Sequence, residues 1–391
     1  MPQDKRQSWL GSWWRLLRAN PLEWLLFAIP VAFAVWYLEV GEVWVFVASG
    51  VAIIPLAGLM GRATEVLASR LGAGIGGLLN ATFGNAAELI IALVALAQGP
   101  KMYPLVKASI TGSIMGNVLL VLGMAATLGG LRYKHQYFNR TAASMGATLL
   151  TLATVGLIVP TLYYYVFATN LPLRPEQLRT VESLSEEIAC ILAGVYLLSL
   201  VFSLGTHRKI YAGVEEETPS LEAESPEWTR TTAIVVLLLA TVGVAAMSEL
   251  LVHSVEQAAH TLGMSSVFVG VIVLAIVGNA AEHSTAVLVA MKNKMDLSVN
   301  IAIGSGIQIA LFVAPVLVFS SVLMGHDRPL DLHFTPMEIV AVSISILVLA
   351  LVAQDGETHW LEGVMLLAVY AILALAFYHL GEIAPPEIQA V

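Results

Sequence analysis

Charged residues and cysteines are scarce in this chain of 391 residues. Only 12% of the residues are charged, whereas a soluble domain usually carries about 25%. Hydrophobic residues make up 58%, which indicates a polytopic membrane protein. Cys190 is the one cysteine, so no disulfide framework can form within the chain. The formal net charge of -9 argues against binding to nucleic acid.

Several sequence patterns are also absent. The apolar segments are continuous rather than alternating, which excludes a transmembrane β-barrel. No His-Glu-x-x-His stretch or Gly-x-Ser-x-Gly elbow is present, so we expect a protein that is not an enzyme. Residues 1–20 lack an apolar core followed by a small-residue cleavage site. Their tryptophan and basic residues favour a helix lying on the cytoplasmic membrane surface, with disorder as the alternative.

Long apolar runs dominate the rest of the chain. A helix that spans a bilayer needs about 20 mainly apolar residues, and eleven segments qualify. The predicted spans are residues 22–38, 42–70, 74–97, 103–128, 141–168, 184–204, 231–260, 265–291, 297–323, 336–353 and 360–379. The sequence therefore predicts an all-α protein with eleven transmembrane helices, whose surroundings are a lipid bilayer.

The lysine and arginine residues predict how these spans are oriented. With the N-terminus in the cytoplasm, 14 of them fall on the inner side and 5 on the outer side. The outer set is Lys101, Lys107, Arg174, Arg179 and Arg328. Because positive residues concentrate in cytoplasmic loops, we expect a cytoplasmic N-terminus and an external C-terminus.

One seven-residue phrase occurs twice, and the chain is organised around it. The first copy is FGNAAEL at 83–89, and the second is VGNAAEH at 277–283. Each copy places a glutamate, Glu88 or Glu282, in the middle of an apolar segment. Ionisable residues inside a membrane are candidates for function because a charge there is costly. The glycines of the phrase could also loosen the helix and free backbone carbonyls.

The similarity between the two halves extends beyond this phrase. Residues 64–72 align with 255–263, and residues 111–113 align with 303–305. Spans two to six therefore match spans seven to eleven. Five is an odd number, so the second copy enters the membrane from the opposite side, which is typical of secondary transporters.

This repeat predicts a division of the chain. Residues 1–41 form an N-terminal segment with the first span, 42–205 the first repeat, and 230–391 the second repeat with a short tail. Residues 206–229 form an acidic cytoplasmic loop that holds six glutamates. The loop is either a solvated linker or a site that concentrates cations.

The repeated phrase has the chemistry of a site for a hard cation. Asn85 and Glu88 share a helix face, as do Asn279 and Glu282. Cysteine and paired histidine ligands are missing nearby, which disfavours zinc and copper. Carboxylate, amide and carbonyl oxygens suit Ca²⁺. Once the cation leaves, two buried carboxylates favour protonation, so cation and protons would compete. The alternative, helix-packing hydrogen bonds, is disfavoured by the duplication.

Other polar residues are candidates for the cation pathway. Glu65, Glu249 and Glu256 lie toward the ends of the second and seventh spans, where they either line entry paths or contact water as ordinary helix-end charges. For His253 and His283 a structural role is favoured; His283 either orients Glu282 or relays protons. The candidates inside apolar helices are Ser113, Asn117, Ser305 and Gln308. These four either line the site or form ordinary interhelical hydrogen bonds.

The two phrases resemble the paired signature motifs of the cation/proton exchangers in the Ca²⁺:cation antiporter superfamily. Residues 112–123 and 304–312 are similar to the fourth and ninth helices of that family. The resemblance covers essentially the whole chain and implies eleven helices with an acidic loop after the sixth. It also implies that Glu88 and Glu282 bind Ca²⁺ and exchange protons, and that Asn85 and Asn279 help to form the site.

The resemblance also implies a counter-ion and a location. The serine- and proline-containing repeats of sodium/calcium exchangers are absent, which favours the proton. The long N-terminal extension of many plant members is absent too, so the resemblance implies a prokaryotic inner-membrane protein without a cofactor. A homo-oligomer is compatible with the sequence. The alternatives are an antiporter of the same fold for Mn²⁺, Na⁺ or K⁺ and, less favoured, a cation channel.

Overall fold

A computed structural model describes residues 21–168, 175–207, 210, 228–326 and 328–383. The first half contains η1 (Pro21–Phe27), α2 (Ala28–Tyr37), α3 (Glu42–Phe83), α4 (Ala86–Ala97), η2 (Pro100–Met102), α5 (Tyr103–Met115), η3 (Gly116–Val121), α6 (Leu122–Arg132), β1 (Gln136–Tyr137), α7 (Arg140–Ala168), α8 (Pro175–Val201) and η4 (Phe202–Thr206). The predicted interfacial helix at 1–20 and most of the acidic loop lie outside the described residues.

The second half repeats much of this order. It contains α10 (Arg230–Thr261), α11 (Ser266–Phe268), η6 (Val269–Leu274), α12 (Ala275–Gly278), α13 (Ala280–Ala290), α14 (Met295–Gln308), η7 (Ile309–Val313), α15 (Ala314–Leu323), α16 (Pro336–Val352), β2 (Glu357–Thr358) and α17 (Trp360–Ile383). The strands β1 and β2 pair antiparallel and join loops of the two halves.

The predicted class of helical membrane protein is confirmed. Seven helices of the described chain are long and apolar enough to cross a membrane, or up to nine if each of two bent pairs forms one span. Two shorter apolar helices, Trp24–Tyr37 and Pro336–Val352, coincide with the first and tenth predicted spans. The count of eleven crossings stays a prediction.

The boundary between the second and third predicted spans falls among the residues assigned to α3. A Cβ added to Gly76 would lie 2.2 Å from the carbonyl oxygen of Ala68. A straight helix would separate these two residues by about 12 Å along its axis. The chain of α3 therefore turns back on itself between them, which places its two arms as separate segments.

The helix contacts of the two halves correspond to one another. The helix α4 packs on α10, and its counterpart α13 packs on α3, the counterpart of α10. In the same way α6 packs on α17 while α15 packs on α8, and α5 packs on α16 while α14 packs on α7. This reciprocity is the contact pattern that an internal two-fold repeat produces.

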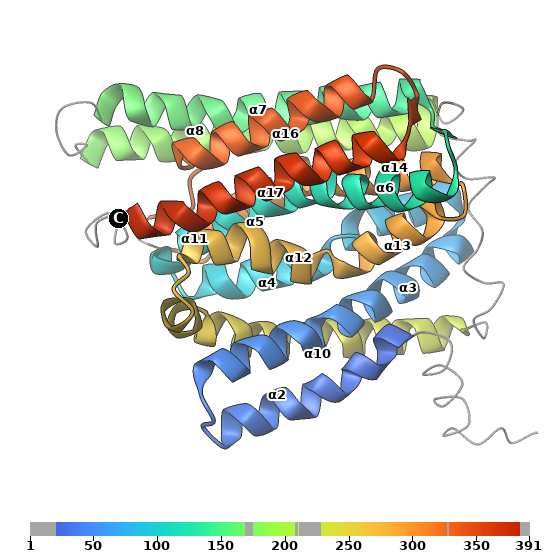
Figure 1. Cartoon of the computed structure of the whole chain (residues 1–391). Helices are drawn as coiled ribbons and strands as arrows, with labels where there is room; N and C mark the ends of the chain where they lie inside the picture. Colours follow the sequence, from blue (N-terminus) through green and yellow to red (C-terminus); the bar gives the residue numbers. More distant parts are fainter. Residues whose placement is uncertain (1–20, 169–174, 208–209, 211–227, 327, 384–391) are drawn as a thin grey trace, which may run out of the picture.

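Figure 1 shows the helices side by side in layers. The helix α2 lies at one edge, followed by α3 and α10, and α7 and α8 lie at the opposite edge. The start of η1 and the end of α17 lie at opposite ends of the bundle, as an odd number of crossings requires.

The loop between α15 and α16 closes one end of the bundle. Lys107 of α5 forms an ion pair with Asp331 and donates to the carbonyl of His333 at 2.8 Å. The His333 ring stacks on Tyr164 with the centroids 3.7 Å apart. Burial raises the pKa of the Asp331 carboxyl, but the Lys107 ammonium outweighs it and holds that pKa below its usual value. Burial, followed by Lys107, lowers the pKa of His333 to about 4.

Candidate functional site

Both copies of the repeated phrase break a helix. The helices before and after Asn85 meet at a bend of 46°, and those before and after Asn279 meet at 59°. Asparagine side chains compete for helical carbonyls, and the Ala275 carbonyl accepts from the Asn279 side-chain amide at 2.9 Å as well as from its backbone N–H at 3.2 Å. The predicted loosening of the helix is therefore confirmed in both halves.

Each break fixes the position of a glutamate. Glu88 lies in the first turn of α4, and Glu282 lies in the first turn of α13. The positive end of a helix dipole favours a negative side chain there. The two carboxylates lie close enough for their charges to interact.

The asparagines of the phrase belong to a network of hydrogen bonds between the two halves. The Asn85 amide donates to Gln308 Oε1 at 2.6 Å, and its oxygen accepts from Ser305 Oγ at 2.7 Å. The Asn279 amide donates to Ser113 Oγ at 3.1 Å. Asn117 Nδ2 donates to Asn279 Oδ1 and to Ser305 Oγ, each at 2.9 Å. The structure thus brings all six predicted amide and hydroxyl residues together.

The carboxylates have no such partners among the described residues. Glu88 is 8% exposed, and both of its carboxylate oxygens are buried without a hydrogen-bond donor. Glu282 is half-buried, and its Oε2 is also buried without a hydrogen-bond donor. The ring of His283 is buried beside Glu282, and its Nε2 finds no partner within the described chain. Buried polar groups are nearly always hydrogen-bonded, so unpartnered carboxylates point to a ligand.

A glycine of the phrase makes room for Glu88. A Cβ added to Gly278 would lie 2.9 Å from Glu88 Cγ, and one added to Gly84 would lie 2.9 Å from Gln308 Oε1. The repeated phrase predicted only that these glycines loosen the helix and free backbone carbonyls. Only the tertiary structure shows that each glycine leaves room for a side chain of the other half.

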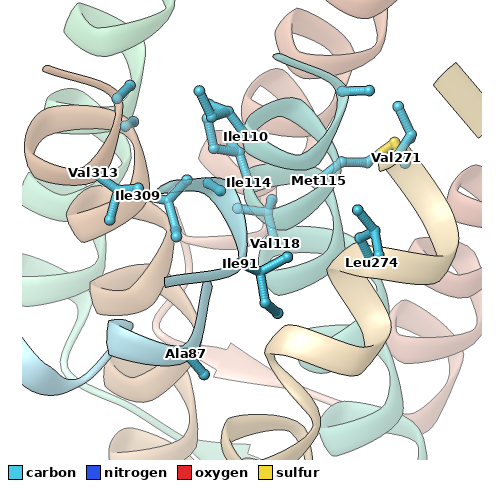
Figure 2. Close-up of a cluster of buried hydrophobic side chains, with 14 of the residues drawn as sticks. Ala87, Ile91, Ile110, Ile114, Met115, Val118, Val271, Leu274, Ile309 and Val313 are labelled. Carbon is cyan, nitrogen blue, oxygen red and sulfur yellow. The ribbon is translucent and has the colours of Figure 1, made fainter. Parts of the chain in front are cut away.

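A buried apolar cluster includes two neighbours of Glu88 on α4. Figure 2 shows Ala87 and Ile91 of α4, on either side of Glu88 in the sequence, packed with Ile114 of α5, Leu274 of η6 and Ile309 of η7. Electrostatic interactions beside such a cluster are stronger than in water, because apolar side chains lower the local dielectric constant.

The helices opposite the glutamates contain π-helical turns at equivalent places. Asn117 lies in the π turn η3, and Gln308 directly precedes the π turn η7. Such turns are frequent at functional sites. No residue pattern had predicted them.

The three pathway glutamates lie on the long helices α3 and α10. Glu65 is half-buried on α3. Glu249 is exposed on α10, as is His253. Glu256, near the end of α10, accepts from Lys101 Nζ at 2.7 Å. The structure therefore places these three on α3 and α10, the two helices that pack on α13 and α4.

Comparison with known proteins gives a consistent result. A Ca²⁺/H⁺ antiporter of Synechocystis is 49% identical over 371 residues, which cover 90% of this chain and 96% of the relative. The Ca²⁺/H⁺ antiporter ChaA of Bacillus subtilis is 45% identical and covers 84% of this chain and 90% of its own. The solved structure of native YfkE superposes with a TM-score of 0.75 at 39% identity, covering 91% of this chain and 99% of that one.

A family model supports the same grouping across both halves. The model described as sodium/calcium exchanger protein matches residues 41–205 and 232–379. These ranges contain every candidate residue of the site and of the pathway. The chain therefore belongs to the sodium/calcium exchanger protein family.

Proposed function

We propose that this integral membrane protein is a secondary transporter that exchanges Ca²⁺ for H⁺ by alternating access. The observation that carries the proposal is the pair Glu88 and Glu282, whose buried oxygens lack hydrogen-bond donors among the described residues. Two carboxylates neutralise one divalent ion. When the ion leaves, the pair favours protons, because two like charges in an apolar site are costly. Competition for the same oxygens couples the two fluxes.

The asparagines complete the proposed cation site. Asn85 and Asn279 flank the carboxylates, and their oxygens accept hydrogen bonds from Ser305 and Asn117. These bonds would be exchanged for the cation when it binds, because amide oxygens are good Ca²⁺ ligands. Ser113, Asn117, Ser305 and Gln308 hold the amides in position, and His283 adjoins Glu282.

The topology completes the proposal. The two repeats span 42–205 and 230–391, with a cytoplasmic N-terminus and an external C-terminus in a prokaryotic inner membrane. The acidic loop at 206–229 is then cytoplasmic. Glu65 lies on the inner approach, whereas Glu249 and Glu256 lie on the outer one. The residues of the proposed site all belong to one chain, and a homo-oligomer stays compatible with the proposal.

Ca²⁺ is preferred over other cations on two grounds. The proposed ligands are all hard oxygen atoms, and the relatives from Synechocystis and Bacillus subtilis are named as Ca²⁺/H⁺ antiporters. Mn²⁺ accepts the same ligand types, so it is the competitor to include in a transport assay.

The test uses everted membrane vesicles with an imposed proton gradient. Wild-type protein accumulates Ca²⁺, and Glu88→Gln or Glu282→Gln abolishes accumulation. Glu187→Gln, a matched change at an exposed position of α8, transports as wild type. Accumulation at the wild-type rate by either site variant would refute the two-carboxylate site. Preference for Mn²⁺, Na⁺ or K⁺ over Ca²⁺ in the same assay would assign another substrate.

A further inference from the structure

An ion pair between Lys101 and Glu256 joins the two halves of the chain at one end of the bundle, which we call the mouth. Lys101 belongs to η2, the short turn between α4 and α5, and Glu256 belongs to α10. Lys101 Nζ lies 2.7 Å from Glu256 Oε2. The side chains are 75% and 41% exposed, so both remain accessible to water and ions. The ion pair therefore links the turn after the Glu88 helix to a helix of the other half.

Glu256 is one member of a polar stripe on α10. Glu249 lies seven residues earlier on the same helix face, about 10 Å away along the axis, with His253 between them. Glu249 and His253 are exposed although they lie within an apolar helix. Because a charge facing hydrocarbon is costly, this stripe faces water. The helix α10 also packs on α4, which carries Glu88. The stripe thus runs along a helix adjoining the proposed site.

We propose that Lys101 is a tethered cation that competes with the transported ion for Glu256 and lowers the affinity for Ca²⁺ at this mouth. The inference rests on the proposed function. The Lys101 ammonium neutralises Glu256, the first carboxylate that an incoming ion meets. The ion must therefore displace this ammonium before it can bind Glu256. An ion that leaves the central site is bound only weakly at this mouth. The pair therefore favours release on the outer side in the proposed orientation.

The second half offers the same combination at the opposite end. The loop between α13 and α14 carries Lys292 and Lys294, in the place that Lys101 occupies after α4. The helix α13 packs on α3, which carries Glu65, the residue aligned with Glu256. A lysine after the glutamate-bearing helix and a glutamate on the facing helix thus occur in both halves, which favours a role in transport over a chance surface contact.

A double-mutant cycle tests the proposal on right-side-out vesicles. Exposed ion pairs contribute little, so Lys101→Met lowers the KM for external Ca²⁺ by about two- to fivefold. Lys101→Arg preserves the pair and keeps the wild-type KM. Glu256→Gln raises the KM, and Lys101→Met added to Glu256→Gln changes it no further, because Lys101 acts through that carboxylate.

Two results would overturn the inference. One is an unchanged or raised KM in Lys101→Met. The other is that Lys101→Met lowers the KM equally in the wild type and in Glu256→Gln. Lys101 would then act through the electrostatic potential of the whole mouth and not through Glu256. Wild-type vesicles that show no Ca²⁺-dependent proton flux would instead refute the proposed function, so the two failures are distinguishable.

Discussion

At the scale of single residues, Glu88 and Glu282 are the groups that need explanation. A buried carboxylate without a donor is destabilising unless it is protonated or holds a cation. Their neighbours Asn85 and Asn279 have donors for their oxygens. The amide groups of Asn85 and Asn279 are therefore held in place before a ligand binds. The carboxylates of Glu88 and Glu282 instead need a proton or a cation.

Gly278 sets the position of Glu88. In Gly278→Ala the new Cβ would lie 2.9 Å from Glu88 Cγ, so the carboxylate must move. Overpacking of this kind typically costs 1–3 kcal/mol, which predicts about a tenfold loss of apparent Ca²⁺ affinity in vesicle transport. Gly194→Ala in α8 is the control, since no atom lies within 4 Å of its Cβ. Equal effects of the two variants would contradict this account.

Asn117 orients two residues of the site through one amide. Asn117→Ala removes the donor to Asn279 Oδ1 and Ser305 Oγ. We expect a several-fold rise in the KM for Ca²⁺ with a folded, monodisperse protein, because each lost hydrogen bond contributes about 1 kcal/mol. Asn300→Ala, whose amide bonds only within α14, should leave the KM unchanged. A rise in both variants would remove the special role of Asn117.

At the scale of elements, the broken helices could be foreseen and the π turns could not. The Gly-Asn pair at 84–85 and again at 278–279 is a local signal for helix interruption. The π turns η3 and η7 lie in ordinary apolar sequence and depend on packing between the halves. For the same reason the residues of the network were predicted, whereas their pairing across the interface was not.

Long-range ion pairs show the same limit. Nothing in the local sequence links Lys101 to Glu256 or Lys107 to Asp331, because both pairs join residues more than a hundred positions apart. Alignment of the two halves indicates which helices are equivalent, but it does not show which loops meet.

The loop between α15 and α16 makes the stability of the fold depend on pH. The pKa of an unfolded histidine is about 6.5, whereas burial lowers the pKa of folded His333 to about 4. Between these values the unfolded chain binds more protons, so stability falls as the pH drops. His333→Gln removes this contribution, and its melting temperature in detergent should fall less between pH 7.5 and pH 4.5 than that of wild type.

His135→Gln provides the control for this pH effect. His135 is an exposed histidine of the loop between α6 and α7. Its replacement should leave the wild-type pH dependence in place. An unaltered pH dependence in His333→Gln would show that the histidine titrates normally in the fold.

At the scale of the whole molecule, the two halves are related by contacts and by sequence. The helix α4, which carries Glu88, packs on α10 of the other half, and α13, which carries Glu282, packs on α3. An arrangement of this kind lets one site be approached from either side. The charge asymmetry then predicts the side on which each loop lies.

Labelling tests this topology. In a Cys190→Ser background, single cysteines replace Gly263 and Gly325 on the predicted outer side, or His135 and Asn293 on the inner side. A membrane-impermeant maleimide applied to intact cells should modify the first pair only. Modification of the second pair alone would invert the orientation, and modification of one member from each pair would break the two-repeat topology.

The central claim is that Ca²⁺ and protons compete for one pair of carboxylates. The direct measurement is Ca²⁺ uptake and proton movement recorded together in proteoliposomes across a range of pH. The account predicts that protons leave as Ca²⁺ enters, that the KM for Ca²⁺ rises as the pH falls, and that Glu88→Gln and Glu282→Gln abolish both fluxes. Ca²⁺ uptake that proceeds without proton movement, with a KM independent of pH, would contradict it.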